Sequence, residues 1–132
     1  MKKKVLIVCA NYYADISNGL LINVKKKLKE PFDLILVPGV FEIPVTISKN
    51  IKKYDGFIAL GCVIKGETPH FDFISKATIE AIMKLSVEHK KPIGNGIITC
   101  LSHKQAFARQ KKGQEAAAAL LAVLIPSKVL TK

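Results

Sequence analysis

The segment GFIALGCVIKGETPHFDFISKATIEAIMKLSVEHKKPIGNGIITC, residues 56–100, contains the pattern that decides the fold. It opens with the apolar run GFIALGCV and closes with IGNGIITC, and both have the length and composition of buried strands. Between them, FDFISKATIEAIMKLSVEHKK is long enough for about five helical turns before Pro92 ends the helix. This order predicts two parallel strands joined by a right-handed crossover.

The same alternation extends through the rest of the chain. KVLIVCA and FDLILVPG, which begin at Lys4 and Phe32, predict two more strands buried on both faces. Apolar residues then recur every fourth position, as in amphipathic helices, at Ile16, Leu20, Val24 and Leu28 and at Ile43, Ile47 and Ile51. We therefore predict an α/β fold, a flavodoxin-like three-layer sandwich with a four-stranded parallel sheet, in a single domain spanning residues 1–132.

The last helical segment, GQEAAAALLAVLI at residues 113–125, is apolar around nearly its whole circumference. A helix of this kind needs cover on more than one side. Because 49% of this small chain is hydrophobic, we expect a partner subunit to provide that cover.

Basic residues dominate the charge of the chain. Lys and Arg number 21 against 10 Asp and Glu, a formal net charge of +11, which raises the question of nucleic acid binding. The lysines fall as KKK at the N-terminus, as KKKLK at residues 25–29 and then singly or in pairs, a distribution typical of solvated helix faces. No aromatic residues interleave with them and no known motif is present, so we predict no nucleic acid partner.

Three widely spaced cysteines, Cys9, Cys62 and Cys100, form no CxxC pair. This spacing argues against disulfides and a metal site and indicates a reducing compartment. Each cysteine is expected to be a small buried hydrophobe. No apolar run approaches the ~18 residues of a membrane span. We therefore predict a cytoplasmic protein with no membrane segment and no metal.

The segments that follow the four predicted strands hold much of the distinctive chemistry. They are NYYAD, PGVFEIP, KGETPH and CLSHKQAFAR, and they contain two of the three histidines and the single arginine, Arg109. In open α/β sheets, ligands bind beyond the carboxyl ends of the strands. A binding site is therefore expected at this edge of the sheet.

Two interpretations of the GETPH segment, residues 66–70, are open from the residues alone. In the first, Thr68 caps a helix that Pro69 opens, and His70 is an incidental polar residue in its first turn. In the second, backbone amides at the helix start bind an anion, and His70 moves protons beside it.

The motifs VPGVFEIP, ALGCVIKGETPHFDFI, KPIGNGIIT and KQAFAR…KKGQEAA, in this order, resemble those of the lumazine synthases, the penultimate enzymes of riboflavin biosynthesis. The resemblance covers nearly the whole chain. It implies a transferase that joins a ribitylamino-pyrimidinedione to a dihydroxybutanone phosphate and releases phosphate and water. It also implies no metal or organic cofactor, and a homo-oligomer with shared active sites. In that family the rings are pentamers that either stay free or pack into icosahedral shells, and we expect a free homopentamer here.

The resemblance further assigns a catalytic position, His70, and a set of substrate-binding positions. The binding positions are Tyr12, Val40, Phe41, Glu42, Val63, Ile64, Lys65, Gly66, Glu67, Thr68, Asn95, Arg109 and Lys112. Tyr12 would stack on the pyrimidine, and Glu42 would accept hydrogen bonds from the ribityl hydroxyls. The helix start after Gly66 would receive the phosphate together with Arg109, and His70 would act as the acid or base.

Two features depart from the family pattern. Asn95 stands where the family commonly has a phenylalanine that reaches into the site of the neighbouring subunit. Several residues usual after Arg109 are missing, so Lys112 aligns with the site lysine of the family and Lys111 is the alternative.

Two other functions remain as alternatives. One is a flavodoxin-like module that binds a flavin or a phosphate without catalysis, and it would not need His70. The other is a homologue of the archaeal-type riboflavin synthases, against which the intact GETPH segment argues.

Overall fold

The structure is a computed structural model that describes residues 3–66 and 70–126. The roles predicted for Glu67 and Thr68 lie outside the described residues. The elements in chain order are β1 (Val5–Ala10), α1 (Ala14–Lys27), β2 (Phe32–Val37), the 3-10 helix η1 (Val40–Glu42), α2 (Ile43–Asn50), β3 (Gly56–Ile64), α3 (Phe71–His89), β4 (Ile93–Cys100), α4 (His103–Ala108) and α5 (Lys112–Leu124). The predicted alternation of strands and helices is confirmed.

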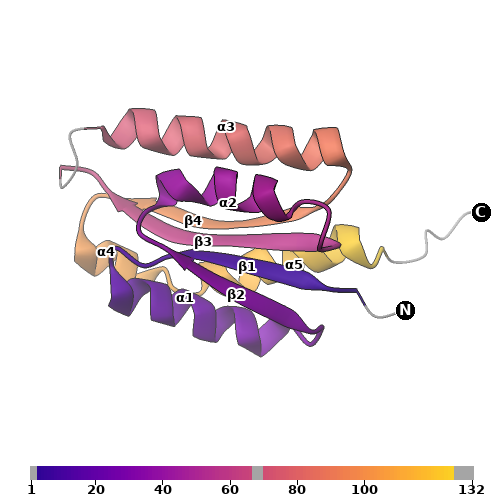
Figure 1. Ribbon diagram of the computed structural model, residues 1–132. Helices are drawn as coiled ribbons and strands as arrows, with labels where there is room; N and C mark the ends of the chain where they lie inside the picture. Colours follow the sequence, from indigo (N-terminus) through magenta and orange to yellow (C-terminus); the bar gives the residue numbers. More distant parts are fainter. Residues whose placement is uncertain (1–2, 67–69, 127–132) are drawn as a thin grey trace, which may run out of the picture.

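The four strands form one parallel sheet in the order β2-β1-β3-β4. Helices α2 and α3 cover one face of the sheet, and α1 and α5 cover the other (Figure 1). All strands run in the same direction, so their carboxyl ends meet at one edge, on the left in Figure 1. The predicted three-layer α/β sandwich is therefore confirmed, and so is the edge at which a ligand site is expected.

Burial differs between the central and the outer strands. Strands β1 and β3 are buried along their whole length, as expected. The prediction that the second strand is buried on both faces was wrong, because Leu34 and Leu36 on β2 are exposed. They pair with Ile7 and Cys9 and so lie on the α1 side of the sheet. Helix α1 packs on β1 and β3 instead, which leaves this face of the outer strand uncovered.

Helix α5 packs closely against the sheet and α1 through small residues. A Cβ atom added at Gly94 would lie 2.2 Å from the Ala116 backbone oxygen, and one at Gly113 would lie 2.1 Å from that of Leu20. The opposite side of α5 leaves Val123 exposed, as the apolar pattern predicted. Within the described residues, no helix combines the length and the apolar character needed to cross a membrane.

Candidate functional site

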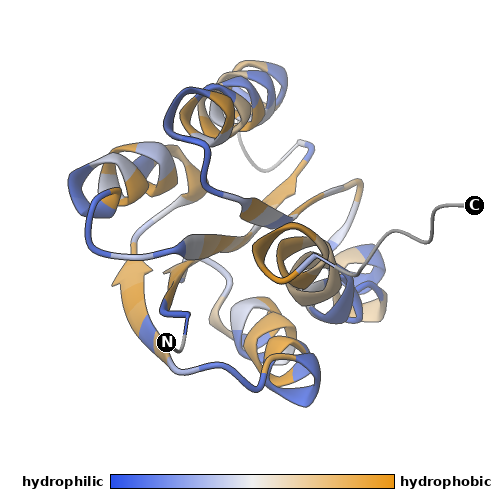
Figure 2. Cartoon of the chain, turned by 90° about the vertical axis from the view of Figure 1, so that its right-hand side faces the viewer, coloured by the Kyte–Doolittle hydropathy of each residue, from blue (hydrophilic) through white to orange (hydrophobic). Residues whose placement is uncertain are grey.

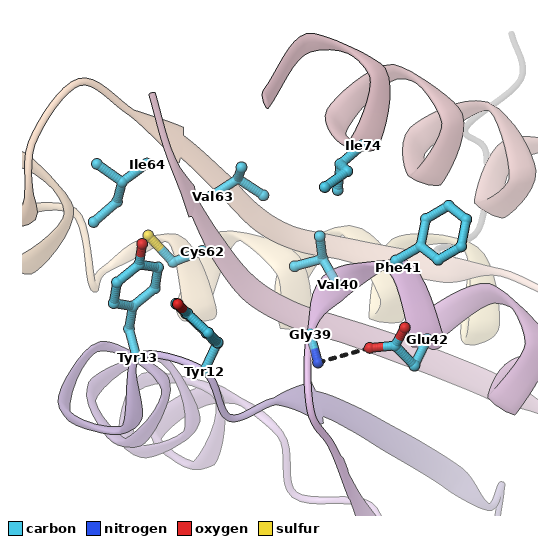
Figure 3. A pocket seen from close by; sticks show the side chains of 10 residues that line it. All are labelled: Tyr12, Tyr13, Gly39, Val40, Phe41, Glu42, Cys62, Val63, Ile64 and Ile74. Atoms are coloured by element: carbon cyan, nitrogen blue, oxygen red, sulfur yellow. Dashed lines mark hydrogen bonds between the residues drawn. The ribbon is translucent and has the colours of Figure 1, made fainter. Parts of the chain in front are cut away.

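A cavity of about 300 Å³ opens at the carboxyl edge of the sheet (Figure 3). We call it the Tyr12 cavity. Its walls come from the segment after β1, from η1, from the end of β3 and from the second turn of α3, and they consist of Tyr12, Tyr13, Gly39, Val40, Phe41, Glu42, Cys62, Val63, Ile64 and Ile74. Six predicted substrate-binding residues are thus brought together: Tyr12, Val40, Phe41, Glu42, Val63 and Ile64.

Aromatic rings rim this cavity on two sides. The Tyr12 side chain is 73% exposed and packs edge-on against Tyr13, with ring centroids 4.9 Å apart. Phe41 is 63% exposed and lies on the other side, beside Glu42 (Figure 3). An exposed ring that is held at its edge keeps a face free for stacking on a flat ligand.

The Glu42 carboxylate has a structural partner as well as a place in the cavity. Its Oε1 accepts a hydrogen bond of 2.9 Å from the Gly39 amide, which closes η1 (Figure 3). Glu42 therefore closes η1 and also lines the cavity. A carboxylate has about four acceptor positions, so one such bond leaves capacity for ligand hydroxyls.

The loop after β3 positions the predicted acid or base at the start of α3. Gly66 has a φ of +89°, a conformation that favours glycine. Helix α3 begins at Phe71 with His70 at the N-cap position, where its side chain makes no capping hydrogen bond. His70 thus precedes the first turn rather than lying within it, which differs from the incidental interpretation. Lys65 and Gly66 follow the wall residue Ile64, and His70 precedes the wall residue Ile74. None of these three residues lines the cavity itself.

Comparison with known proteins decides the family. A family model described as 6,7-dimethyl-8-ribityllumazine synthase matches residues 2–126. The chain belongs to this family. The 6,7-dimethyl-8-ribityllumazine synthase 1 of Rhodopseudomonas palustris is 44% identical, over 98% of this chain and 88% of its own length. The synthases of Bartonella bacilliformis and Agrobacterium fabrum are 44% and 42% identical, over 84% and 86% of this chain and 78% and 84% of their own lengths.

The resemblance to the lumazine synthases is thereby confirmed, but one chain does not unite all the residues that it implies. Arg109 and Lys112 line a second cavity of about 510 Å³, which we call the Arg109 cavity. Its walls share no residue with those of the Tyr12 cavity. Arg109 Nη1 lies 3.5 Å from the Thr99 carbonyl oxygen, beside the end of β4. Lys111 lines the same cavity, so the choice between the two lysines stays open.

Asn95, the residue that departs from the family pattern, also lies apart from the Tyr12 cavity. It is partly buried in β4, and its Oδ1 accepts a hydrogen bond of 3.0 Å from the Ile97 amide. The polar side chain is therefore engaged with its own strand. It lines neither of the two cavities described above.

A pair of residues that carried no predicted role supports the aromatic wall of this lumazine synthase family member. His103 Nε2 lies 3.0 Å from Asp15 Oδ2, and its ring centroid is 6.3 Å from that of Tyr13. Desolvation raises the pKa of Asp15, but the hydrogen bonds from His103 and from the Ile16 amide together outweigh it, so this pKa lies below its ordinary value. These residues lie 88 positions apart, so the sequence carried no signal for the pair.

The depressed pKa of Asp15 makes a prediction for stability. Such a carboxylate stabilises the fold above its unfolded pKa, about 3.9, and that contribution is lost as the pH falls through the lower folded value. We expect Asp15→Asn to lower the melting temperature at pH 6 and to lower it less at pH 3. Thermal unfolding followed by circular dichroism measures both.

Asp72→Asn provides the matched control. Asp72 is also a first-turn carboxylate, on α3, and makes no ion pair among the described residues. An equal loss in both variants would show that only the interaction with the helix dipole matters, and not the pair with His103.

Proposed function

We propose that this chain is a lumazine synthase, a transferase of riboflavin biosynthesis. It would condense 5-amino-6-(D-ribitylamino)uracil with 3,4-dihydroxy-2-butanone 4-phosphate to give 6,7-dimethyl-8-ribityllumazine, inorganic phosphate and water. Membership of the family over residues 2–126 supports this function. The observation that carries it is the Tyr12 cavity, where six of the predicted binding residues meet at the carboxyl edge of the sheet.

The Tyr12 cavity suits the pyrimidine substrate. Its volume of about 300 Å³ lies at the lower end of the range for small-molecule sites. Tyr12 would stack on the flat ring between the apolar walls formed by Val63 and Ile64, with Lys65 beyond them. Glu42 would accept hydrogen bonds from the ribityl hydroxyls and so fix the amino group in one orientation.

His70 would supply the proton transfers. Imine formation, loss of phosphate and ring closure each move a proton at near-neutral pH, and imidazole is suited to both directions of transfer. None of these steps exchanges electrons with an external partner, so the proposal includes no redox cofactor. Holding both substrates in register would supply much of the rate, up to roughly 7–11 kcal/mol in favourable cases.

In this proposal, binding of the substrate phosphate requires residues from a second copy of the chain. Arg109, Lys111 and Lys112 gather in their own cavity, whose walls share no residue with those of the Tyr12 cavity. An interface between copies would bring the Arg109 cavity of one copy to the Tyr12 cavity of the next. The exposed side chains of Phe41, on the rim, and Val123, on α5, support burial between copies. We propose a free homopentamer with shared sites.

Two broader expectations are retained in this proposal. A single domain spanning residues 1–132 is supported by two core clusters that lie on opposite faces of one sheet. A cytoplasmic location is supported by the three cysteines, which are all free and buried.

Arg109→Lys tests the proposed binding of the substrate phosphate by Arg109. The substitution keeps the charge but loses the planar fork that binds phosphate through two hydrogen bonds. We expect the KM for the butanone phosphate to rise about tenfold while the KM for the pyrimidine stays unchanged. Initial rates with each substrate varied in turn measure both constants. Lys111→Gln and Lys112→Gln, measured in parallel, identify which lysine contributes.

Inorganic phosphate should inhibit the wild-type enzyme in competition with the butanone phosphate. Because Arg109→Lys weakens the same site, the inhibition constant for phosphate should rise with the KM in that variant. A lack of inhibition at every tested concentration would contradict an anion site at this place.

A direct assay tests the proposed function. The purified chain is mixed with both substrates while lumazine fluorescence and free phosphate are followed. We expect equal molar amounts of both products. Binding of a flavin or of phosphate without turnover would favour the non-catalytic module, and consumption of added lumazine would favour the riboflavin synthase alternative.

A further inference from the structure

The positive charge of this chain is concentrated at the end of the sheet opposite the Tyr12 cavity. The strands begin there and α1, α2 and α3 end there, on the right in Figure 1. We call this end the amino-end face. Its eleven lysines are Lys3, Lys4, Lys25, Lys26, Lys27, Lys29, Lys49, Lys52, Lys53, Lys90 and Lys91. Its acidic residues are Glu30, Asp33, Asp55 and Glu88, so eleven cations less four anions leave a formal +7.

The carboxyl edge has almost no excess charge by the same count. Five cations, Lys65, Lys104, Arg109, Lys111 and Lys112, face four anions, Asp15, Glu42, Asp72 and Glu115, which leaves a formal +1. Strands of six to nine residues at 3.3 Å per residue separate the two ends by roughly 20–30 Å. That separation is several times the Debye length of ~8 Å at physiological salt, so the amino-end face contributes little to attracting substrate.

Most of these lysines have no partner within the described chain. Lys4 lies 3.6 Å from Asp33, and Lys91 donates a hydrogen bond of 2.6 Å to the Ile51 carbonyl oxygen. The other nine lysines are exposed and form no ion pair with a described residue. Figure 2 looks onto this end, and the turns that face the viewer are blue.

Helix dipoles explain only part of this charge. Lysines in the last turn of a helix interact favourably with its carbonyl end, which accounts for Lys25, Lys26 and Lys27 on α1 and for Lys49 on α2. The remaining exposed lysines lie outside the helices, where like charges repel one another without that compensation. An anionic partner would remove this repulsion.

We infer that the amino-end face binds the phosphate backbone of nucleic acid without reading its sequence. Ammonium groups on flexible stems suit phosphates as point charges. The face has no arginine for bidentate contacts to bases. Its Tyr54 ring is engaged by Lys4 Nζ, 5.0 Å from the ring centroid, and by Phe57, so it is not free to stack on a base. An anionic membrane surface fits less well, because membrane-surface helices also insert aromatic side chains. The exposed aromatic residues of the described chain, Tyr12, Phe41, Phe73 and Phe107, lie outside the amino-end face. This inference revises the sequence-based expectation of no nucleic acid partner.

The test measures binding by fluorescence anisotropy, with a labelled 24-base-pair DNA duplex and a single-stranded RNA of mixed sequence, between 50 and 200 mM KCl. Contact with about three to five phosphates predicts a slope of log K against log salt of about −3 to −5 for duplex DNA. The variant Lys25→Gln/Lys26→Gln/Lys52→Gln should lose about 2 to 3 units of slope and about 10- to 100-fold in affinity at 50 mM.

The control variant, Lys76→Gln/Lys84→Gln/Lys104→Gln, removes three lysines outside the amino-end face. It should lose less than about threefold in affinity, and both triple variants should keep the wild-type rate of lumazine formation. The inference is overturned by an absence of binding at 50 mM salt, by equal losses in the two variants, or by binding to phosphatidylglycerol vesicles without binding to nucleic acid. None of these outcomes depends on the proposed active site.

Discussion

Replacing His70 with asparagine is expected to lower kcat for lumazine formation by roughly 10- to 1000-fold. Asparagine retains hydrogen-bonding capacity at the N-cap of α3 but cannot carry a proton between substrate atoms. The loss stays at the lower end for acid–base catalysis because the Tyr12 cavity still positions the substrates. Single-turnover kinetics followed by lumazine fluorescence separate this chemical step from product release.

The other rim histidine provides the control for this experiment. His103 is tied to Asp15 at 3.0 Å and lies against Tyr13, so His103→Asn should change kcat by less than about threefold. Product affinity should be unchanged in His70→Asn, because proton transfer contributes nothing to equilibrium binding. A wild-type rate in His70→Asn would show that this histidine is only the residue before a helix.

Local patterns were sufficient to predict the four strands and the helices α1, α2, α3 and α5, but not α4. The site residues came from the family resemblance, and six of them line the Tyr12 cavity. Apolar runs and four-residue spacing identified the strands and helices, since both depend on residues that are close in sequence. The Tyr12 cavity followed because parallel strands carry their carboxyl ends to one edge. Four wall residues lie outside the predicted set: Tyr13, Gly39, Cys62 and Ile74. The first three adjoin predicted residues in the sequence, whereas Ile74 comes from α3 and had no such signal.

Features that depend on how the strands and helices are arranged in space were not predicted. The strand order β2-β1-β3-β4 makes β2 an outer strand, and no pattern within FDLILVPG could show that Leu34 and Leu36 lie uncovered. The pair of Asp15 and His103 likewise depends on α4 lying beside the start of α1. The lysines were read as scattered because they are scattered in sequence. The topology collects them, since every crossover returns the chain to the same end of the sheet.

A mixture of two impaired variants is expected to regain activity that neither has alone. Arg109→Ala removes the phosphate grip, and His70→Asn removes the acid or base. If each site takes His70 from one copy and Arg109 from its neighbour, some interfaces in a mixed ring contain both wild-type residues. Random assembly from equal amounts gives such sites at about one quarter of the interfaces. The mixture should therefore reach about a quarter of the wild-type kcat per site, whereas His70→Asn alone stays at about one tenth or less.

Co-expression of the two variants with different affinity tags, followed by purification on both tags, isolates mixed assemblies for this measurement. A second mixture, of wild type with the double variant His70→Asn/Arg109→Ala, distinguishes the two arrangements. Shared sites again predict about one quarter of the wild-type activity, because both neighbours must then be wild type. Sites contained within one chain predict about one half, and they predict no regain in the first mixture. One half of the activity in the second mixture with no regain in the first, or an active monomer in light scattering, would contradict a site divided between the Tyr12 and Arg109 cavities of neighbouring copies.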